Sequence, residues 1–480
     1  ASFGTRLLIH MLNASGAGAS RAKPLDFELD TSLDPTVIGF TALIVILTTL
    51  FFGLLPALRA SGAAPNAVLK EHGHGSVSGG GGPFTLVNVM VAVQVGLALT
   101  LLSAAALFGE SFRRILTVDS GFEVQNVVRV PVEIPQALLA TGQRMREYDA
   151  ALERVRSIPG VRSAAHSDLT PLGHMTWNEY VYVDGYKAKP VEDDRLTYFN
   201  SVSPGYFETM GTKLIAGRDF DARDTASALR VVIIGETTAR TFWGRENPLG
   251  QILKRDSPLN NGKQDPFVVI GIVKDMKYES LSEQTLKTAF VSSAQEPNPR
   301  NGTNYVIRLD SMESAGRVLP LVRAALLETD KNFSLQFEDF DSQVSDSLIR
   351  PRLIAVVSGF FGAVALILAA TGLYGVISYS TARRRTEIGL RMALGAGYRS
   401  VIWLVLRDIG VTLIMGAALG LTAAHFAGRL VESMVFDVRP TDPSVLGVAL
   451  AMLVVSASIA AYLPARRAAR VDPMDSLRME

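Results

Sequence analysis

Long apolar runs alternate with ordinary polar sequence along this chain of 480 residues. A helix crosses a lipid bilayer with about 20 apolar residues, because each residue rises 1.5 Å. Runs of this kind lie at residues 37–55, 87–108, 353–378, 401–427 and 445–463. A single run could be a buried core helix, but a soluble fold rarely holds several, so the pattern predicts five transmembrane helices.

The stretch between the second and third runs has ordinary soluble composition and is long enough to bury a core of its own. Alternating apolar positions at residues 179–183 and the apolar run 266–273 predict strands. Apolar spacing over residues 144–157 and 314–328 predicts amphipathic helices. We therefore expect an α+β domain, arranged in two lobes, inserted between membrane helices.

Basic residues in the short connections predict the orientation, because such residues favour the cytoplasmic side. The connection 382–400 and the tail after the last run are rich in arginine, and Arg59 and Lys70 lie between the first two runs. These segments share one side if all five helices cross. The chain is thus predicted to be a multi-pass membrane protein with its large domain on the extracytoplasmic side.

This topology predicts eleven consecutive segments. They are an extracytoplasmic segment (1–36), a transmembrane helix (37–57), a cytoplasmic Gly-rich linker (58–85), a transmembrane helix (86–109), the periplasmic α+β domain (110–350), a transmembrane helix (351–380), a cytoplasmic helix (381–400), a transmembrane helix (401–427), a periplasmic loop (428–442), a transmembrane helix (443–464) and a cytoplasmic tail (465–480).

Composition and missing motifs exclude several functions. The chain has no cysteine, which removes disulfides and thiolate chemistry, and its net charge of +1 gives no argument for nucleic acid. No phosphate-binding Gly-x-x-x-x-Gly-Lys-Ser/Thr motif occurs, and Gly262-Lys263 is followed by Gln264. His72 and His74 fit a flexible linker better than a metal site. We therefore expect no catalytic, cofactor-binding or metal-binding residue and no enzyme activity in this chain.

An internal repeat explains why the number of predicted spans is odd, with the first run belonging to a different unit from the other four. The first apolar run is followed by Leu55-Pro56-Ala57 and the last by Leu463-Pro464-Ala465, each with a basic residue and then a proline close behind. Chance similarity of two membrane exits is the alternative. The repeat predicts that the sequence begins inside one unit, N-terminally incomplete, and then contains a complete second unit.

Small and polar residues in the runs predict helix packing. Gly416 and Gly420 form a small-xxx-small pair, and Gly359 and Gly362 lie in the third run. Such residues serve either packing within the chain or an interface with a second copy or half. Gln94 is a strongly polar residue in the interior of its run, and we expect it to bond between helices, with a transport-site role as the alternative.

The segment after the third run has a regular charge spacing. Arg383, Glu387 and Arg391 recur at helical intervals, so they share one face of a predicted helix. Anchoring of positive charge in lipid headgroups would explain the arginines alone. It does not explain the spacing of Glu387 or the two glycines Gly389 and Gly395.

Local motifs resemble one family. Residues 383–396 are similar to the R-x-x-E-I-G-I-R-x-A-L-G-A segment of MacB-type, FtsX-like transporter permeases. Residues 205–211, 216–220, 241–250 and 269–275 resemble the family's periplasmic core. The duplicated arrangement is most similar to the acidobacterial duplicated orphan permeases. The resemblance implies a multi-pass α-helical membrane protein with an inserted α+β domain, the MacB-like periplasmic core. It also implies that the protein lies in the bacterial inner (plasma) membrane with this large domain in the periplasm.

The resemblance also implies a role. The chain would be the permease subunit of an ABC-type system, and a separate cytoplasmic subunit would bind ATP. The implied coupling residues are Arg383, Arg384, Arg385, Glu387, Gly389, Arg391 and Gly395. Stalks near residues 107–116 and 342–352 would pass the motion to the periplasmic domain, for efflux. FtsX-like signalling to a periplasmic partner such as a cell-wall hydrolase is the alternative.

The same resemblance implies the binding partners. Besides the ATP-binding subunit, these are membrane lipid and a periplasmic or outer-membrane partner. The chain would also form either a homodimer or a pair with a second repeat. No nucleic acid is expected.

Overall fold

The computed structural model describes residues 35–50, 86–133, 141–173, 176–187, 194–256, 264–296, 302–331, 333–383 and 398–468. The chain divides into two compact units. The described residues of the first lie in Leu101–Val364 and Ala424–Ala449. Those of the second lie in Ala22–Thr100, Ala365–Ala423 and Leu450–Glu480.

Four helices in the described part of the chain are long and apolar enough to cross a membrane. They are α5 (Leu86–Thr117), α10 (Phe340–Arg383), α12 (Tyr398–Val431) and α13 (Pro443–Ala468). The second to fifth predicted spans fall within these helices. The first is described only as the shorter apolar helix α2 (Pro35–Thr49) and residue 50.

The membrane helices differ from the predicted spans at their ends. Helix α5 continues to Thr117 and α10 begins at Phe340, so both include the stretches predicted as stalks. Helix α12 runs four residues past the predicted end at 427, to Val431. Large apolar side chains such as Ile367, Ile414 and Ile459 are 65%, 70% and 63% exposed, as suits helices whose solvent is lipid.

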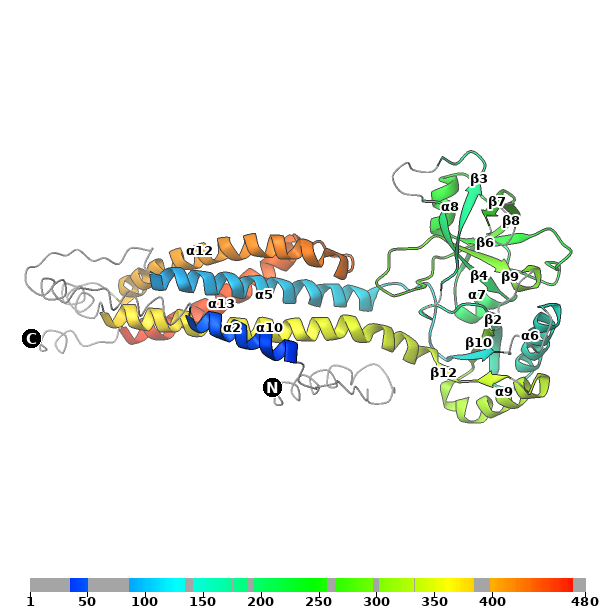
Figure 1. Cartoon of the computed structure of the whole chain (residues 1–480), viewed down its shortest axis with the longest axis horizontal. Coiled ribbons are helices and arrows are strands. Elements are labelled where there is room, and N and C mark those ends of the chain that lie inside the picture. Colours follow the sequence, from blue (N-terminus) through cyan, green and yellow to red (C-terminus); the bar gives the residue numbers. More distant parts are fainter. Residues whose placement is uncertain are drawn as a thin grey trace, which may run out of the picture. The chain divides into compact units, whose positions relative to one another are not determined.

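The inserted domain, residues 118–339, contains a small antiparallel sheet. Strand β10 (Gly302–Leu309) pairs with β1 (Val127–Glu133) on one side and β2 (Val161–Ser167) on the other. Short strands β11 (Ser334–Leu335) and β12 (Glu338–Asp339) also pair with β1. Helices α6 (Thr141–Arg156) and α9 (Ala315–Thr329) lie side by side against the sheet and share a buried core with it (Figure 1).

The other strands close into a six-stranded ring. Going round it, the strands are β4 (Leu196–Val202), β3 (Asn178–Val183), β7 (Ile252–Asp256), β8 (Gln264–Val273), β6 (Val231–Gly235) and β9 (Thr288–Ser292). Parallel pairing of β9 with β4, from Tyr198↔Thr288 to Val202↔Ser292, closes the ring. Strand β5 (Leu214–Gly217) pairs with β8 beside it. One residue pair, Ser167↔Val202, joins β2 of the small sheet to the ring.

Alternation along β6 explains its continuous apolar sequence. Val232 and Ile234 join the core inside the ring, whereas Val231 and Ile233 join a second core on the other face. Successive side chains of a strand point to opposite faces, so a strand buried on both must be apolar throughout. Helix α8 (Glu236–Trp243) follows β6 and contributes Phe242 to the ring core.

The predicted elements of the inserted domain are present. Strands β3 and β8 contain residues 179–183 and 266–273, and helices α6 and α9 correspond to residues 144–157 and 314–328 within three residues at each end. The small sheet and the ring belong to one 12-stranded sheet, and a division of the domain into two lobes stays a prediction.

Candidate functional site

The segment that leaves α5 is fixed tightly to the inserted domain. Gly121 has φ +79°, and a Cβ there would overlap the carbonyl oxygen of Asp275. The Thr212 hydroxyl donates to the Gly121 carbonyl at 3.0 Å, and the Lys277 amide donates to the Ser120 carbonyl at 2.9 Å. The Glu123 amide donates to the Met210 carbonyl at 2.8 Å. The end of α5 is thus joined to the domain by its own main chain.

Arg308 reinforces this junction from β10. Its guanidinium donates to the carbonyls of Thr209, Gln125 and Glu123 at 2.9, 3.2 and 3.4 Å. Burial lowers the pKa of Arg308, but an arginine stays charged in proteins. The Glu123 carboxylate lies 3.3 Å away. One cation therefore binds the segment after α5 to the end of helix α7 (Tyr206–Met210).

The start of α10 enters the same core. Phe340 is fully buried, and its ring meets the ring of Phe122 edge to face with centroids 5.7 Å apart. Val344 and Leu348 of α10 pack against the same cluster, and Gln343 donates to the Pro171 carbonyl at 3.3 Å. Both helices that carry the inserted domain are therefore anchored in one apolar core at its base.

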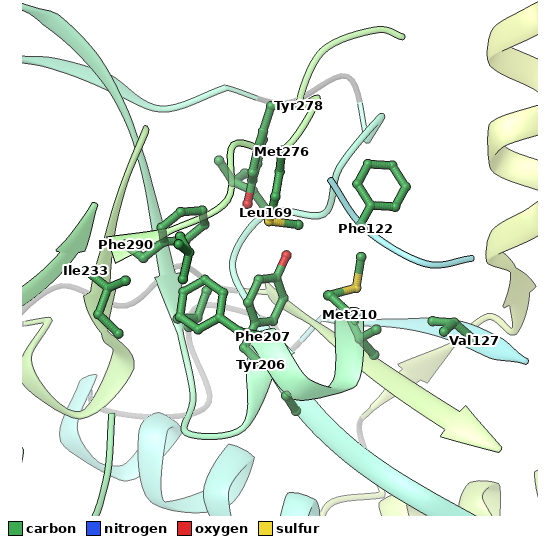
Figure 2. Close-up of a cluster of buried hydrophobic side chains, with 14 of the residues drawn as sticks. Phe122, Val127, Leu169, Tyr206, Phe207, Met210, Ile233, Met276, Tyr278 and Phe290 are labelled. Carbon is green, nitrogen blue, oxygen red and sulfur yellow. The ribbon is translucent and has the colours of Figure 1, made fainter. Parts of the chain in front are cut away.

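Helix α7 supplies the centre of this core, which we call the base core. Gly205 and Gly211 flank α7 with φ of +80° and +67°, so each takes a left-handed conformation that favours glycine. Figure 2 shows Tyr206, Phe207 and Met210 of α7 gathered with Phe122, Met276 and Phe290. The glycine-flanked motif at residues 205–211 thus folds into a short helix that shares the base core with Ile115 of α5.

Other family-like motifs shape the ring. A Cβ on Gly217 would overlap the Ile270 carbonyl, so glycine permits β5 to approach β8. Arg218 donates to both carboxylate oxygens of Asp224 at 2.8 and 2.7 Å. Asp275 accepts from the amide and hydroxyl of Thr237 at the start of α8, and burial raises the pKa of Asp275.

Glycines of α12 lie directly against α5 within the second unit. A Cβ on Gly416 would lie 2.8 Å from the Ala92 carbonyl, and one on Gly420 would lie 2.7 Å from the Gly96 carbonyl. The Thr100 hydroxyl lies within bonding distance of the Gly420 carbonyl, at 3.3 Å. The Gly416/Gly420 pair therefore makes a close contact inside this chain.

The remaining predicted packing residues differ from one another. Gln94 donates to the Leu368 carbonyl of α10 at 2.8 Å, and a Cβ on Gly372 would overlap its amide oxygen. A Cβ on Gly362 would lie 3.0 Å from Ala105 of α5. Gly359 has no described neighbour within 4 Å of such an atom, so packing among the described residues does not explain it. Contact of Gly359 with another half or copy stays a prediction.

The predicted coupling residues fall mostly beyond the described structure. Arg383 is the last residue of α10. The other six, Arg384, Arg385, Glu387, Gly389, Arg391 and Gly395, lie in residues 384–397, outside the described residues, as do His72, His74 and His174. No group of three potential metal ligands occurs among the described residues. His166 is buried, with Nε2 3.0 Å from Asp149, between β2 and α6.

Sequence reasoning missed three residues at these contacts. Gly96 lies midway between Ala92 and Thr100, so small residues at four-residue intervals could have revealed the face of α5 that meets α12. Arg308 is a lone charge among the apolar residues of β10, a pattern that suggests a buried cation. Nothing local marks Gly121, whose contact with Asp275 is distant in sequence.

These features define a class of protein: a helical membrane protein with one large inserted domain carried on two continuous helices. The MacB-like periplasmic core domain family matches residues 89–325, and the FtsX-like permease C-terminal family matches residues 359–473. The chain belongs to the FtsX-like permeases that carry a MacB-like periplasmic core domain.

Two relatives agree with this assignment. A probable export ATP-binding/permease protein of Pseudomonas fluorescens is 25% identical over 337 residues, which cover 66% of this chain and 50% of that protein. Macrolide export ATP-binding/permease protein MacB 2 of Aeromonas hydrophila is 26% identical over 316 residues, covering 62% and 47%. The chain thus spans about half the length of these two relatives.

Two further similarities extend the comparison. The uncharacterized ABC transporter permease YknZ of Bacillus subtilis is 25% identical over 308 residues, which cover 62% of this chain and 74% of YknZ. The crystal structure of the periplasmic region of MacB from Actinobacillus actinomycetemcomitans is 16% identical, with a TM-score of 0.32, and covers 48% of this chain and 95% of that one.

Proposed function

We propose that the chain is the permease subunit of an ABC-type efflux system in the bacterial inner membrane, and that it passes ATP-driven motion to a periplasmic domain. The observation that carries this proposal is the shared anchorage of α5 and α10. Both helices enter the base core through Phe122 and Phe340, and Arg308 and Gly121 fix the segment after α5. A displacement of either helix would therefore move the domain instead of being lost in a linker.

The relatives support the direction of transport and the energy source. Two of them are named export ATP-binding/permease proteins, which suits an exporter driven by ATP. YknZ is named a permease alone, which suits an arrangement with the ATPase on another polypeptide. The energy would then enter through a separate cytoplasmic subunit that docks on residues 381–400, with the arginines and Glu387 setting its register.

The mechanism follows from helix continuity. Helix α10 is one element from Phe340 to Arg383, so its cytoplasmic end borders the predicted docking segment and its other end lies in the base core. ATP binding and hydrolysis would shift this segment, and α10 would carry the shift to the domain as a lever. The work is done on a periplasmic substrate or partner, and nothing need pass through the helices themselves.

Charge reversal tests the docking step. Glu387→Arg and Arg391→Glu should each lower co-purification of an ATP-binding subunit and its permease-stimulated ATPase activity. Arg466→Glu is the matched control, because Arg466 is an exposed arginine on the predicted cytoplasmic side at the end of α13. Unchanged binding and stimulation in both docking variants would contradict the proposal. Stimulation of a periplasmic hydrolase without export would favour signalling instead.

A further inference from the structure

The connection between α12 and α13, residues 432–442, reaches the base of the inserted domain. We call it the α12–α13 loop; it begins with the 3₁₀ turn Glu432–Met434. The half-buried ring of Phe436 packs against the base core, and Lys277 Nζ lies 5.5 Å from its centroid. The amide of Phe436 donates to Ser111 Oγ of α5 at 2.8 Å. One loop residue thus contacts both the domain and α5.

An ionic cluster on α5 holds the next part of the loop. Arg114 donates to the carbonyl of Asp437, and its Nη1 atom lies 3.2 Å from the Asp437 carboxylate. Its Nη2 atom lies 3.8 Å from Asp442, and its Nε bonds Glu110 at 3.1 Å. The hydroxyl and amide of Ser444 hold the pKa of Asp442 below its usual value, so Asp442 stays ionised opposite Arg114.

Apolar contacts and backbone shape complete the attachment. Val438 of the loop forms a small buried cluster with Leu107 of α5 and Val445 of α13. Asp437 has φ +50°, a left-handed conformation that aspartate tolerates better than most residues. A lone exposed ion pair contributes little to stability. The contact therefore depends on its combination with half-buried Phe436 and buried Val438.

We infer that the α12–α13 loop is a third attachment between the membrane helices and the inserted domain, and that Arg114 and Phe436 are its positioning residues. Helix α12 follows directly after the predicted docking segment in the chain. A shift of α12 therefore has a route to the domain that does not depend on α10. The role in transmitting motion rests on the proposed function, whereas the attachment itself does not.

Paired spin labels can test the attachment directly, because the chain has no cysteine of its own. Glu432→Cys labels the loop and Glu328→Cys labels exposed α9 of the domain. In the nucleotide-free full chain, without any ATP-binding subunit, the distance distribution between these labels should be narrow. Arg114→Gln combined with Phe436→Ala should broaden it, since losing a half-buried phenyl shifts the attached-to-detached ratio by roughly tenfold.

Matched controls separate attachment from general damage. Arg113→Gln removes the neighbouring arginine, which pairs with Glu110 alone among the described ion pairs, and Phe426→Ala removes an outward-facing phenylalanine of α12. Both should leave the distribution narrow. A second label pair within the domain, Arg223→Cys with Glu328→Cys, should stay unchanged in every variant and so report an intact fold.

Two outcomes would overturn the inference. A double variant as narrow as the parent would show that Arg114 and Phe436 do not hold the loop. A parent distribution that is already broad would show that the loop is not attached. When the ATP-binding subunit and a trapped nucleotide state are added, the distance distribution should stay narrow, because the loop and the domain move together. If it broadens or shifts only in that state, the claim that the loop and the domain move together is wrong. The efflux proposal does not depend on that claim.

Discussion

The guanidinium of Arg308 in β10 donates a 2.9 Å hydrogen bond to the carbonyl of Thr209 at the end of α7. The same group serves two carbonyls of the segment after α5, so it joins three parts of the chain that are distant in sequence. A single side chain thus decides whether buried main-chain oxygens at the domain base have partners.

Replacement of Arg308 should weaken the domain. Arg308→Met leaves these carbonyls without their donor, and we expect a loss of about 2 kcal/mol in the free energy of unfolding. Arg308→Lys should be intermediate, because an ammonium cannot reproduce the planar fork. Thermal unfolding followed by tryptophan fluorescence measures both. Arg323→Met on the exposed side of α9 is the control and should change little; equal losses in both would contradict this role.

Gly121→Ala tests the junction after α5. A Cβ at this position overlaps the Asp275 carbonyl, and the positive φ adds backbone strain, so we expect a loss of more than about 2 kcal/mol or failure to fold. Gly109→Ala in α5 is the control, because a Cβ at Gly109 would meet no atom within 4 Å. This substitution should stabilise the helix slightly, because alanine favours helix more than glycine does. Folded yield in detergent distinguishes the two. A well-folded Gly121→Ala protein would show that the junction is looser than described.

Glycine replacement on α12 should separate that helix from α5. Gly416→Ile and Gly420→Ile place side chains against the Ala92 and Gly96 carbonyls, so each should lower the melting temperature in detergent. Gly410→Ile is the matched control on the same helix, since its Cβ would meet nothing within 4 Å. If Gly410→Ile lowered the melting temperature as much, the loss would not depend on contact with α5, and the packing role of Gly416 and Gly420 would be contradicted.

The Arg218–Asp224 pair should make stability depend on pH. Hydrogen bonding to Arg218 lowers the pKa of Asp224 below its ordinary value, so the folded state favours the charged carboxylate. Its contribution is therefore full above the ordinary carboxylate range and is lost as the pH falls through the lowered pKa. Asp224→Asn should cost about 1–3 kcal/mol at neutral pH and progressively less below about pH 4.

The measurement for this pair is the difference in free energy of unfolding between parent and variant across pH. Carboxylates with raised pKa, such as Asp275, contribute to both proteins and cancel in the difference. Asp310→Asn, at an exposed position, is the control. A difference for Asp224→Asn that stays constant with pH would contradict the assignment.

The pattern of apolar residues was sufficient to predict the four long membrane helices, because each is a long apolar run. It also predicted helices α6 and α9, because burial of one face leaves a regular apolar spacing. It could not predict the closure of the ring. Strand β9 is buried throughout, and its parallel pairing with β4 depends on long-range register, which no local pattern encodes.

The candidate site divides in the same way. Gly416 and Gly420 were found because their spacing is itself the packing motif, whereas Phe340 and Phe122 are ordinary apolar residues whose meeting depends on the fold. The coupling role of the arginines and of Glu387 after α10 was inferred from spacing and family resemblance. It stays a prediction because residues 384–397 lie outside the described structure.

Ring closure also restricts how this domain can recognise another protein. In the described part of the ring, each of the six strands has a hydrogen-bonded neighbour on both sides. A peptide therefore finds little unpaired main chain there to extend the sheet by strand addition. A partner would therefore have to recognise side chains and loops of the ring. Substitutions of surface side chains should then change partner binding, whereas peptides that mimic an added strand should not.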